Sequence, residues 1–407
     1  MNTKLTQFLL LSAIIALPLY VFRLKIYFFP TTILEILVLI LAFSFLILKI
    51  KEDRKFFSGW PKTSFDFLIL GFLIASFLAI FVSGQKMAAL GIFRAYIAEP
   101  LIIFYIFVEL SKRMDSQKIF LPLILAGSWI VILTILQGIF SIAIFTPAEA
   151  AQGRSTGVFN TGNAVALFLG PIFALTIANF LQTKNFCWRL FLISNIFGII
   201  FGVFFSQSRA GIISILASLV FFLILTKFPF SQLAKFKVPI LRLGLLFFIV
   251  ASVFIALFDL TPKITTPEYS GGNTLLVRFF LWEGTAGLIS DHPLFGAGLA
   301  NFKPFYSANY VLPQYQEALE YPHNWFLATF AELGFLGAIF LTLIIFKFFK
   351  NLIETKNLLS VGLAMAMFYW LVHGLVDVPY FKNDLALEFW VMIGLSEVLR
   401  SKVNKRP

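Results

Sequence analysis

The chain has 407 residues, of which 59% are hydrophobic and only 13% are charged. Water-soluble domains are about half apolar and about a quarter charged, so this composition excludes an ordinary soluble protein and indicates an integral membrane protein. The net charge of +12 does not indicate nucleic-acid binding, because the basic residues lie in short segments between apolar runs. One cysteine, Cys187, excludes an intrachain disulfide, and no Cys/His cluster indicates a metal, so we expect no cofactor.

Apolar runs long enough to cross a bilayer, about 20 residues each, recur along the chain. They predict an all-α integral membrane protein, one polytopic domain (1–407) with about 12 transmembrane helices and one long extracytoplasmic loop that contains short helices. The first run lacks a cleavage site and is followed by further spans, so it predicts a span and not a signal peptide. The predicted spans are 5–22, 31–48, 65–83, 88–108, 119–141, 161–181, 188–206, 210–226, 239–258, 323–346, 358–376 and 384–399.

The distribution of basic residues predicts the orientation of these spans. With the N-terminus in the cytoplasm, 22 of the 32 Lys and Arg residues fall in cytoplasmic segments. This bias predicts a multi-pass protein of the cytoplasmic (inner) membrane with both termini inside and the long loop, residues 259–322, outside.

Three arginines are exceptions to this bias because they lie in polar turns on the predicted outer side. Arg154 and Arg209 precede the sixth and eighth spans, and Arg278 lies in the long loop before the tenth. Each of these spans has its N-terminus outward, where unpaired N–H groups and a partial positive charge favour anions. The three arginines therefore predict a phosphate site, although any one of them alone could be a flanking charge that contacts lipid headgroups.

Within the long loop, apolar residues at spacings of 4, 3, 4 and 3 predict one face of an amphipathic helix. These residues are Leu275, Phe279, Trp282, Ala286 and Ile289. Arg278 lies on the flank of that face. Pro293 ends the helix, since the residue before a proline disfavours the α conformation, and Gly296 and Gly298 permit a tight turn.

The segment Pro322-His323-Asn324 opens the tenth span. Proline fits the first turn of a helix, and the positive end of the helix dipole favours the neutral imidazole that a general base requires. A lone histidine at such a boundary is more often an interfacial residue with an ordinary hydrogen bond, and this interpretation is favoured for His292 and His373.

Arg94 and Glu99 lie inside the fourth span, where a charge is costly and faces the bundle interior. They are five positions apart, which places them roughly 140° from one another on an α-helix, so we expect each to pair with another helix. Structural bracing and the lining of a substrate cavity remain equal alternatives. The polar cluster from Val372 to Asp377 is interpreted as structural.

Six short segments follow one another in a recognisable order: 154–163 (RSTGVFNTGN), 208–211 (SRAG), 278–282 (RFFLW), 291–302 (DHPLFGAGLANF), 323–327 (HNWFL) and 332–334 (ELG). Together they resemble the bacterial O-antigen ligase and O-antigen polymerase superfamily of polytopic membrane glycan transferases. The resemblance covers about the second two-thirds of the chain. Residues 1–90 are similar only in hydropathy.

The resemblance implies transfer of a glycan from an undecaprenyl-pyrophosphate carrier to an acceptor hydroxyl, without metal or nucleotide. It implies His323 as the catalytic residue and Arg278, Arg209, Arg154 and Asn324 as substrate-binding residues. The chemistry agrees, because a pyrophosphate leaving group needs cationic stabilisation and an attacking hydroxyl needs a base. The implied partners are the lipid-linked donor, a glycan or lipid A-core-type acceptor and the lipid bilayer, with no nucleic acid.

Several functions remain open at this point. The leading hypothesis is an O-antigen ligase-like glycosyltransferase at the outer face of the cytoplasmic membrane. A polysaccharide polymerase or a protein O-oligosaccharyltransferase would use the same donor and differ in the acceptor. A lipid-linked glycan transporter is less favoured, because transporters usually contain internal repeats and polar sites near the midplane.

Overall fold

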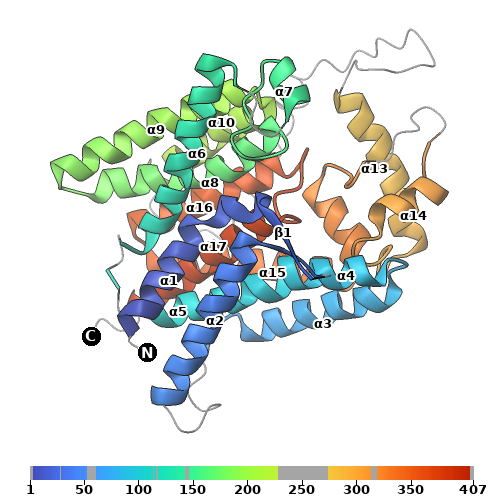
Figure 1. Cartoon of the computed structure of the whole chain (residues 1–407), viewed down its shortest axis with the longest axis horizontal. Helices are drawn as coiled ribbons and strands as arrows, with labels where there is room; N and C mark the ends of the chain where they lie inside the picture. The colour runs from blue at the N-terminus through green and yellow to red at the C-terminus, as the bar shows by residue number, and fades with distance from the viewer. Residues whose placement is uncertain are drawn as a thin grey trace.

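The computed structural model describes residues 3–27, 29–52, 61–112, 114–115, 118–142, 146–227, 274–312 and 319–403. In these ranges the regular secondary structure is helical apart from one antiparallel hairpin, β1 (Arg23–Ile26) and β2 (Phe29–Thr32) (Figure 1). The helices are α1 (Thr3–Ile15), η1 (Leu17–Val21), α2 (Ile33–Glu52), α3 (Asp66–Val82), α4 (Lys86–Phe93), η2 (Arg94–Ala98), α5 (Glu99–Ser111), η3 (Lys118–Phe120), α6 (Leu121–Phe140), α7 (Pro147–Ala151), α8 (Gly162–Gln182), α9 (Phe186–Ser206), α10 (Arg209–Lys227), α13 (Thr274–Asp291), α14 (Phe302–Asn309), α15 (Trp325–Thr355), α16 (Leu358–His373) and α17 (Asn383–Val403).

Seven stretches of helix in the described ranges are long and apolar enough to cross a membrane, so the protein is a multi-pass membrane protein. They are Ile33–Lys51, Lys86–Ser111, Lys118–Phe140, Gly162–Gln182, Phe186–Ser206, Arg209–Thr226 and Trp325–Thr355. Three shorter apolar helices, α1, α3 and α16, accompany them.

The prediction of about 12 spans is therefore not confirmed, although helices occupy most of the predicted positions. The predicted first span is divided, since α1 ends at Ile15 and the 3₁₀ helix η1 follows it. The predicted last span coincides with α17, which carries three acidic and two basic residues and is less apolar than the seven stretches. The predicted span 239–258 lies outside the described residues.

The centre of the bundle is the contact between α8 and α16. There, two side chains of α16 donate hydrogen bonds to backbone carbonyls of α8 next to a proline within that helix. Pro171 has no N–H, so the carbonyl of Leu167 loses its usual intrahelical donor. The indole N–H of Trp370 donates to this carbonyl (2.8 Å), and the hydroxyl of Tyr369 donates to the preceding carbonyl of Ala166 (2.7 Å). The proline therefore fixes which side chains of α16 pack against α8.

The fourth predicted span contains a π-helical turn, η2, between α4 and α5. In a π-helix the N–H bonds the carbonyl five residues earlier, and the N–H of Glu99 accordingly donates to the carbonyl of Arg94. This geometry brings the two side chains to one side, with Nε of Arg94 at 3.4 Å from Glu99. The prediction that they do not pair within their helix was wrong, because it assumed α-helical periodicity. Arg94 also pairs with Glu35 on α2 (2.9 Å), as the prediction of an interhelical partner required.

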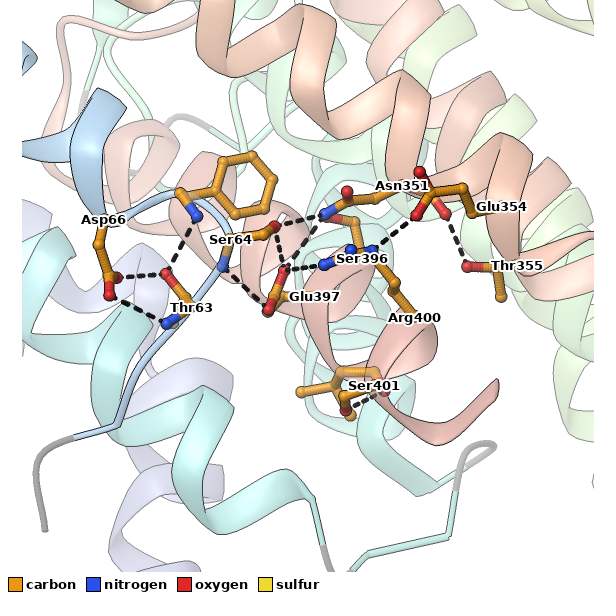
Figure 2. Close-up of polar contacts among 12 residues, drawn as sticks. Thr63, Ser64, Asp66, Asn351, Glu354, Thr355, Ser396, Glu397, Arg400 and Ser401 are labelled. Carbon is orange, nitrogen blue, oxygen red and sulfur yellow. Dashed lines mark hydrogen bonds and ion pairs between the residues drawn. The ribbon is translucent and has the colours of Figure 1, made fainter. Parts of the chain in front are cut away.

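A polar cluster joins the C-terminal end of α15 to α17 and to the segment before α3 (Figure 2). The carboxylate of Glu397 accepts from the N–H (3.1 Å) and the hydroxyl (2.6 Å) of Ser64 and from the side-chain amide of Asn351 (3.2 Å). Arg400 lies between Glu354 (2.7 Å) and Glu397 (4.0 Å). These contacts hold three segments together at this end.

Candidate functional site

The chain just before α15 runs beside the chain just after α16. The N–H of Trp325 donates to the carbonyl of Gly374 (2.7 Å), and the side-chain amide of Asn324 donates to the carbonyl of Leu375 (3.0 Å). The side-chain oxygen of Asn324 also accepts from the N–H of Leu327 (3.0 Å), which makes Asn324 the N-cap of α15. Asn324 thus fixes the start of α15 against the α16–α17 connection.

The helix begins later than the sequence predicts. Pro322 lies two residues before the N-cap and not in the first turn, because Asn324 provides the capping oxygen. His323 consequently lies outside the helix and has a positive φ of 48°. This conformation is uncommon for a residue other than glycine.

His323 faces an acidic side chain from the α16–α17 connection. Its Nδ1 lies 3.4 Å from Oδ1 of Asp377, and 32% of its side chain is exposed. This distance is slightly longer than an ordinary hydrogen bond, as is common in catalytic sites without substrate. The indole N–H of Trp282 donates to the carbonyl of Pro322 (2.9 Å) and holds the backbone next to His323.

Asp377 is held in its charged form. Burial raises its pKa, but the neighbouring His323 and the charges around it outweigh burial and keep the pKa below the usual range of an aspartate. Val378 contributes a backbone N–H to Oδ1 (2.9 Å). A carboxylate in this position can orient the ring of His323 and stabilise its protonated form.

Arg278 on α13 reaches the same connection. Its Nε donates to the carbonyl of Val376 (2.8 Å), next to Asp377. Burial lowers the pKa of Arg278, and the charge of Asp377 opposes this effect. The guanidinium remains protonated at neutral pH, because arginine keeps its charge even when it is buried in a protein.

The helix that carries Arg278 packs differently from the prediction. The predicted apolar face includes Phe279, which is 37% exposed, and Ala286, which is also exposed. The buried residues are instead Leu281 and Leu288, which pack with α14 and α15. The periodicity predicts the helix correctly. The buried face is rotated relative to the predicted one, because α13 packs against α14 and α15.

Arg209 is the first residue of α10 and lies beside the same connection. Ala210, the next residue, packs against Val376 together with Trp282. Arg209 itself is exposed, and no hydrogen bond or ion pair joins it to other residues in the described part of the chain. Its charge is therefore available to a ligand.

Arg154 is engaged in a different way. Its guanidinium pairs with Glu149 (2.9 Å) and donates to the side chain of Asn163 (3.1 Å) and to the carbonyl of Ser206 (3.2 Å). These contacts join the segment before α8 to the end of α9, close to the turn that leads to Arg209. The structure thus brings His323, Arg278 and Arg209 to one connection and gives Arg154 a bracing position behind it.

The glycine-rich part of the long loop also has a structural position. Gly296 and Gly298 both have positive φ, as the tight-turn prediction expects. The turn is fixed by Glu332, whose carboxylate accepts from the N–H groups of Ala300 and Phe302. Gly334 is a non-helical kink in α15 (φ 64°), so the two sequence segments that contain these glycines form one packed unit.

The sequence analysis interprets Asp377 as part of a structural polar cluster, whereas the structure places it beside His323. The signal was present, since an acidic residue directly after an apolar run is expensive in a membrane protein unless it has a partner. The partner could not be identified from the sequence, because Asp377 lies 54 positions after His323.

Comparison with known proteins gives concordant results. Residues 194–342 match the O-antigen ligase family, a segment that contains Arg209, Arg278 and His323. A Rickettsia conorii protein named "Putative polysaccharide ligase" is 25% identical over 197 residues, 45% of this chain and 44% of the relative. A Rickettsia prowazekii protein with the same description is 25% identical over 211 residues, 50% of this chain and 47% of the relative.

The matched region thus spans about half the length of each of these relatives. The family match and both relatives agree with the superfamily that the ordered sequence segments indicate. Over residues 194–342 the chain is thus similar to the O-antigen ligase family.

Proposed function

We propose that the protein is a membrane glycosyltransferase that moves a glycan from an undecaprenyl-pyrophosphate carrier to an acceptor hydroxyl. The observation that carries this proposal is the approach of His323 to Asp377 beside two arginines, Arg278 and Arg209. The match of residues 194–342 to the O-antigen ligase family supports a reaction on glycans. The site offers a base and a cationic surface, which are the two elements that this transfer needs.

His323 is the general base in this proposal. With its Nδ1–H directed at Asp377, the other ring nitrogen, Nε2, is the basic atom. Nε2 accepts the proton of the acceptor hydroxyl while the hydroxyl oxygen forms a bond to the anomeric carbon of the donor sugar. The bond from that carbon to the phosphate oxygen breaks, and direct attack inverts the configuration at the carbon.

The leaving group is undecaprenyl pyrophosphate, whose new negative charge needs a counter-charge. Arg278 and Arg209 supply it, because a guanidinium binds phosphate oxygens in a fixed geometry and keeps its proton. Arg154 takes no direct part in this arrangement; it supports the turn that carries Arg209.

The proposed orientation places this site at the outer face of the cytoplasmic membrane, with both termini in the cytoplasm. The charge distribution of the sequence supports it. Lipid-linked glycans would enter beside α13, and the polyprenyl chain would remain among the apolar helices.

The decisive experiment replaces His323 with alanine. We expect His323→Ala to remain folded in membranes and to lose transfer by about 10²- to 10⁴-fold, the usual contribution of a general base. The readout is accumulation of undecaprenyl-linked glycan in cells. His292→Ala is the matched control, since His292 is an exposed histidine of the same loop that contacts Phe305; unchanged surface glycan in His323→Ala would reject the catalytic assignment.

The glycan profile of a deletion strain separates the alternative acceptors. Long polymer that stays on the lipid carrier indicates a ligase, whereas single repeat units on the final acceptor indicate a polymerase.

A further inference from the structure

Lys382 is a cation without an anionic partner, close to the proposed catalytic pair. It lies between α16 and α17, five residues after Asp377. Its Nζ lies over the rings of Tyr20 (5.4 Å) and Phe159 (5.0 Å), which stack on one another with centroids 6.4 Å apart. No carboxylate approaches its amine within ion-pair distance in the part of the chain that the structure describes.

The charge of Lys382 is therefore stabilised by aromatic rings and not neutralised by an acid. Burial lowers its pKa, while the charges of Asp384 and Asp377 oppose this effect. Both acids are thus close enough to act on the amine without contacting it. A half-buried ammonium group with this environment attracts an anion more strongly than an exposed one, because water screens it less.

Two partly exposed tyrosines contact residues that directly precede Lys382 in the chain. Tyr321 stacks on Phe381, with centroids 5.7 Å apart and planes at 22°. The hydroxyl of Tyr380 donates to the backbone carbonyl of Tyr96 (2.9 Å), which places Tyr96 beside the same turn. In the described residues, the hydroxyls of Tyr321 and Tyr96 have no hydrogen-bond partner.

This combination of groups fits an acidic sugar. Aromatic side chains present an apolar face and a polar hydroxyl, which suits the apolar face and the hydroxyl groups of a sugar ring. Lysine provides a compact point charge for a carboxylate or a phosphate, unlike the planar fork of arginine.

The position of these residues indicates which substrate they hold. Tyr321 lies two residues before His323. Arg278 donates to Val376, the residue before Asp377, whereas Lys382 lies five residues after Asp377. Arg278 therefore reaches the connection just before Asp377, and Lys382 lies in the same connection after it. In direct attack the anomeric carbon lies between the leaving group and the attacking hydroxyl, so the donor phosphate and the acceptor need separate binding groups.

We propose that Lys382, Tyr321 and Tyr96 form a subsite for the acceptor, a sugar that carries a carboxylate or a phosphate group. This inference rests on the proposed glycan transfer. It assigns the cationic arginines to the donor and the single lysine to the acceptor.

The test measures sugar binding to the full-length protein in lipid nanodiscs by saturation-transfer-difference NMR. The probes are glucuronic acid, glucose 6-phosphate and the uncharged methyl ester of glucuronic acid. We expect the wild-type protein to bind at least one charged probe about tenfold more tightly than the ester, the size of one charge-assisted hydrogen bond. Equal binding of all three probes would overturn the proposal without any variant.

The matching variant is Lys382→Met, which keeps the length of the side chain and removes its charge. It should weaken the charged probe about tenfold and leave the ester unchanged, whereas Lys25→Met, an exposed lysine of β1, should bind as the wild type does. Unchanged affinity in Lys382→Met would contradict the subsite. His323→Ala should still bind the charged probe, because His323 is not part of the subsite. If the wild-type protein binds the charged probe but transfers no glycan, the proposed function is rejected and the subsite stands.

Discussion

Both ends of α15 lie beside a group of polar side chains, and the two groups use their charges differently. In the group at the C-terminal end of α15, Arg400 lies between two carboxylates, and the Glu397 carboxylate accepts hydrogen bonds from Ser64 and Asn351 (Figure 2). Before its N-terminus, Asp377 is accompanied by Arg278, and Arg209 is exposed beside them without an acidic partner in the described residues. The 31 residues of α15, with the kink at Gly334, separate the two groups.

This contrast separates bracing from binding. A cluster in which each charge has a partner from the same chain gains little stability from binding a ligand. The cost of removing its charges from water is already offset by its own ion pairs and hydrogen bonds. A cluster with excess positive charge is costly for the protein alone and favourable for an anion. We therefore expect substitutions at the first group to change stability, and substitutions at the second to change activity.

Arg278→Lys should have the largest effect of the tests below. The lysine keeps the charge but cannot donate to Val376 and contact a phosphate with the geometry of a guanidinium. We expect transfer activity to fall by about 10²-fold, as for the loss of one preorganised donor. Nearly full activity in purified Arg278→Lys would show that bidentate phosphate contact is unnecessary.

Asp377→Asn should have a smaller effect on the same reaction. It preserves the shape of the side chain but removes the charge that orients His323 and stabilises its protonated form. We expect at least about a tenfold loss in kcat with little change in KM, because the carboxylate acts through the base. A change confined to KM would instead indicate that Asp377 contacts the substrate.

Glu397→Gln should leave the activity of the folded protein unchanged and lower its stability. The new amide group presents donors to Ser64 and Asn351, which are donors themselves. We expect the free energy of unfolding to fall by about 1–3 kcal/mol, measured in detergent by thermal unfolding. Glu354→Gln is the control at the same end: its carboxylate is 40% exposed, so the loss should be below about 1 kcal/mol. A loss of specific activity in Glu397→Gln would remove the contrast between the two groups.

Much of this protein could be predicted locally. Hydropathy identified the membrane class and placed helices at most of the predicted positions, because each apolar run carries its own signal. The period of residues 275–289 identified α13, and the glycines at 296 and 298 identified the tight turn. Arg209 and Arg278 could be identified as candidate site residues because they are exceptions to the concentration of Lys and Arg in the predicted cytoplasmic segments.

Other features depended on which segments meet. The pairing of Arg94 with Glu99 required a π-turn that α-helical periodicity does not predict. The face of α13 that packs is selected by its neighbours, and the engagement of Arg154 follows from Glu149 on a separate short helix.

The candidate site shows the same division. The sequence by itself determined that His323 precedes an apolar helix and that two arginines lie in nearby turns. Only the tertiary structure decided that Asp377 faces His323 and that Lys382 rests on Tyr20 and Phe159. The physical reason is that helix formation and membrane insertion depend on residues within a few turns, whereas the contacts of a site arise from packing between segments that the sequence keeps far apart.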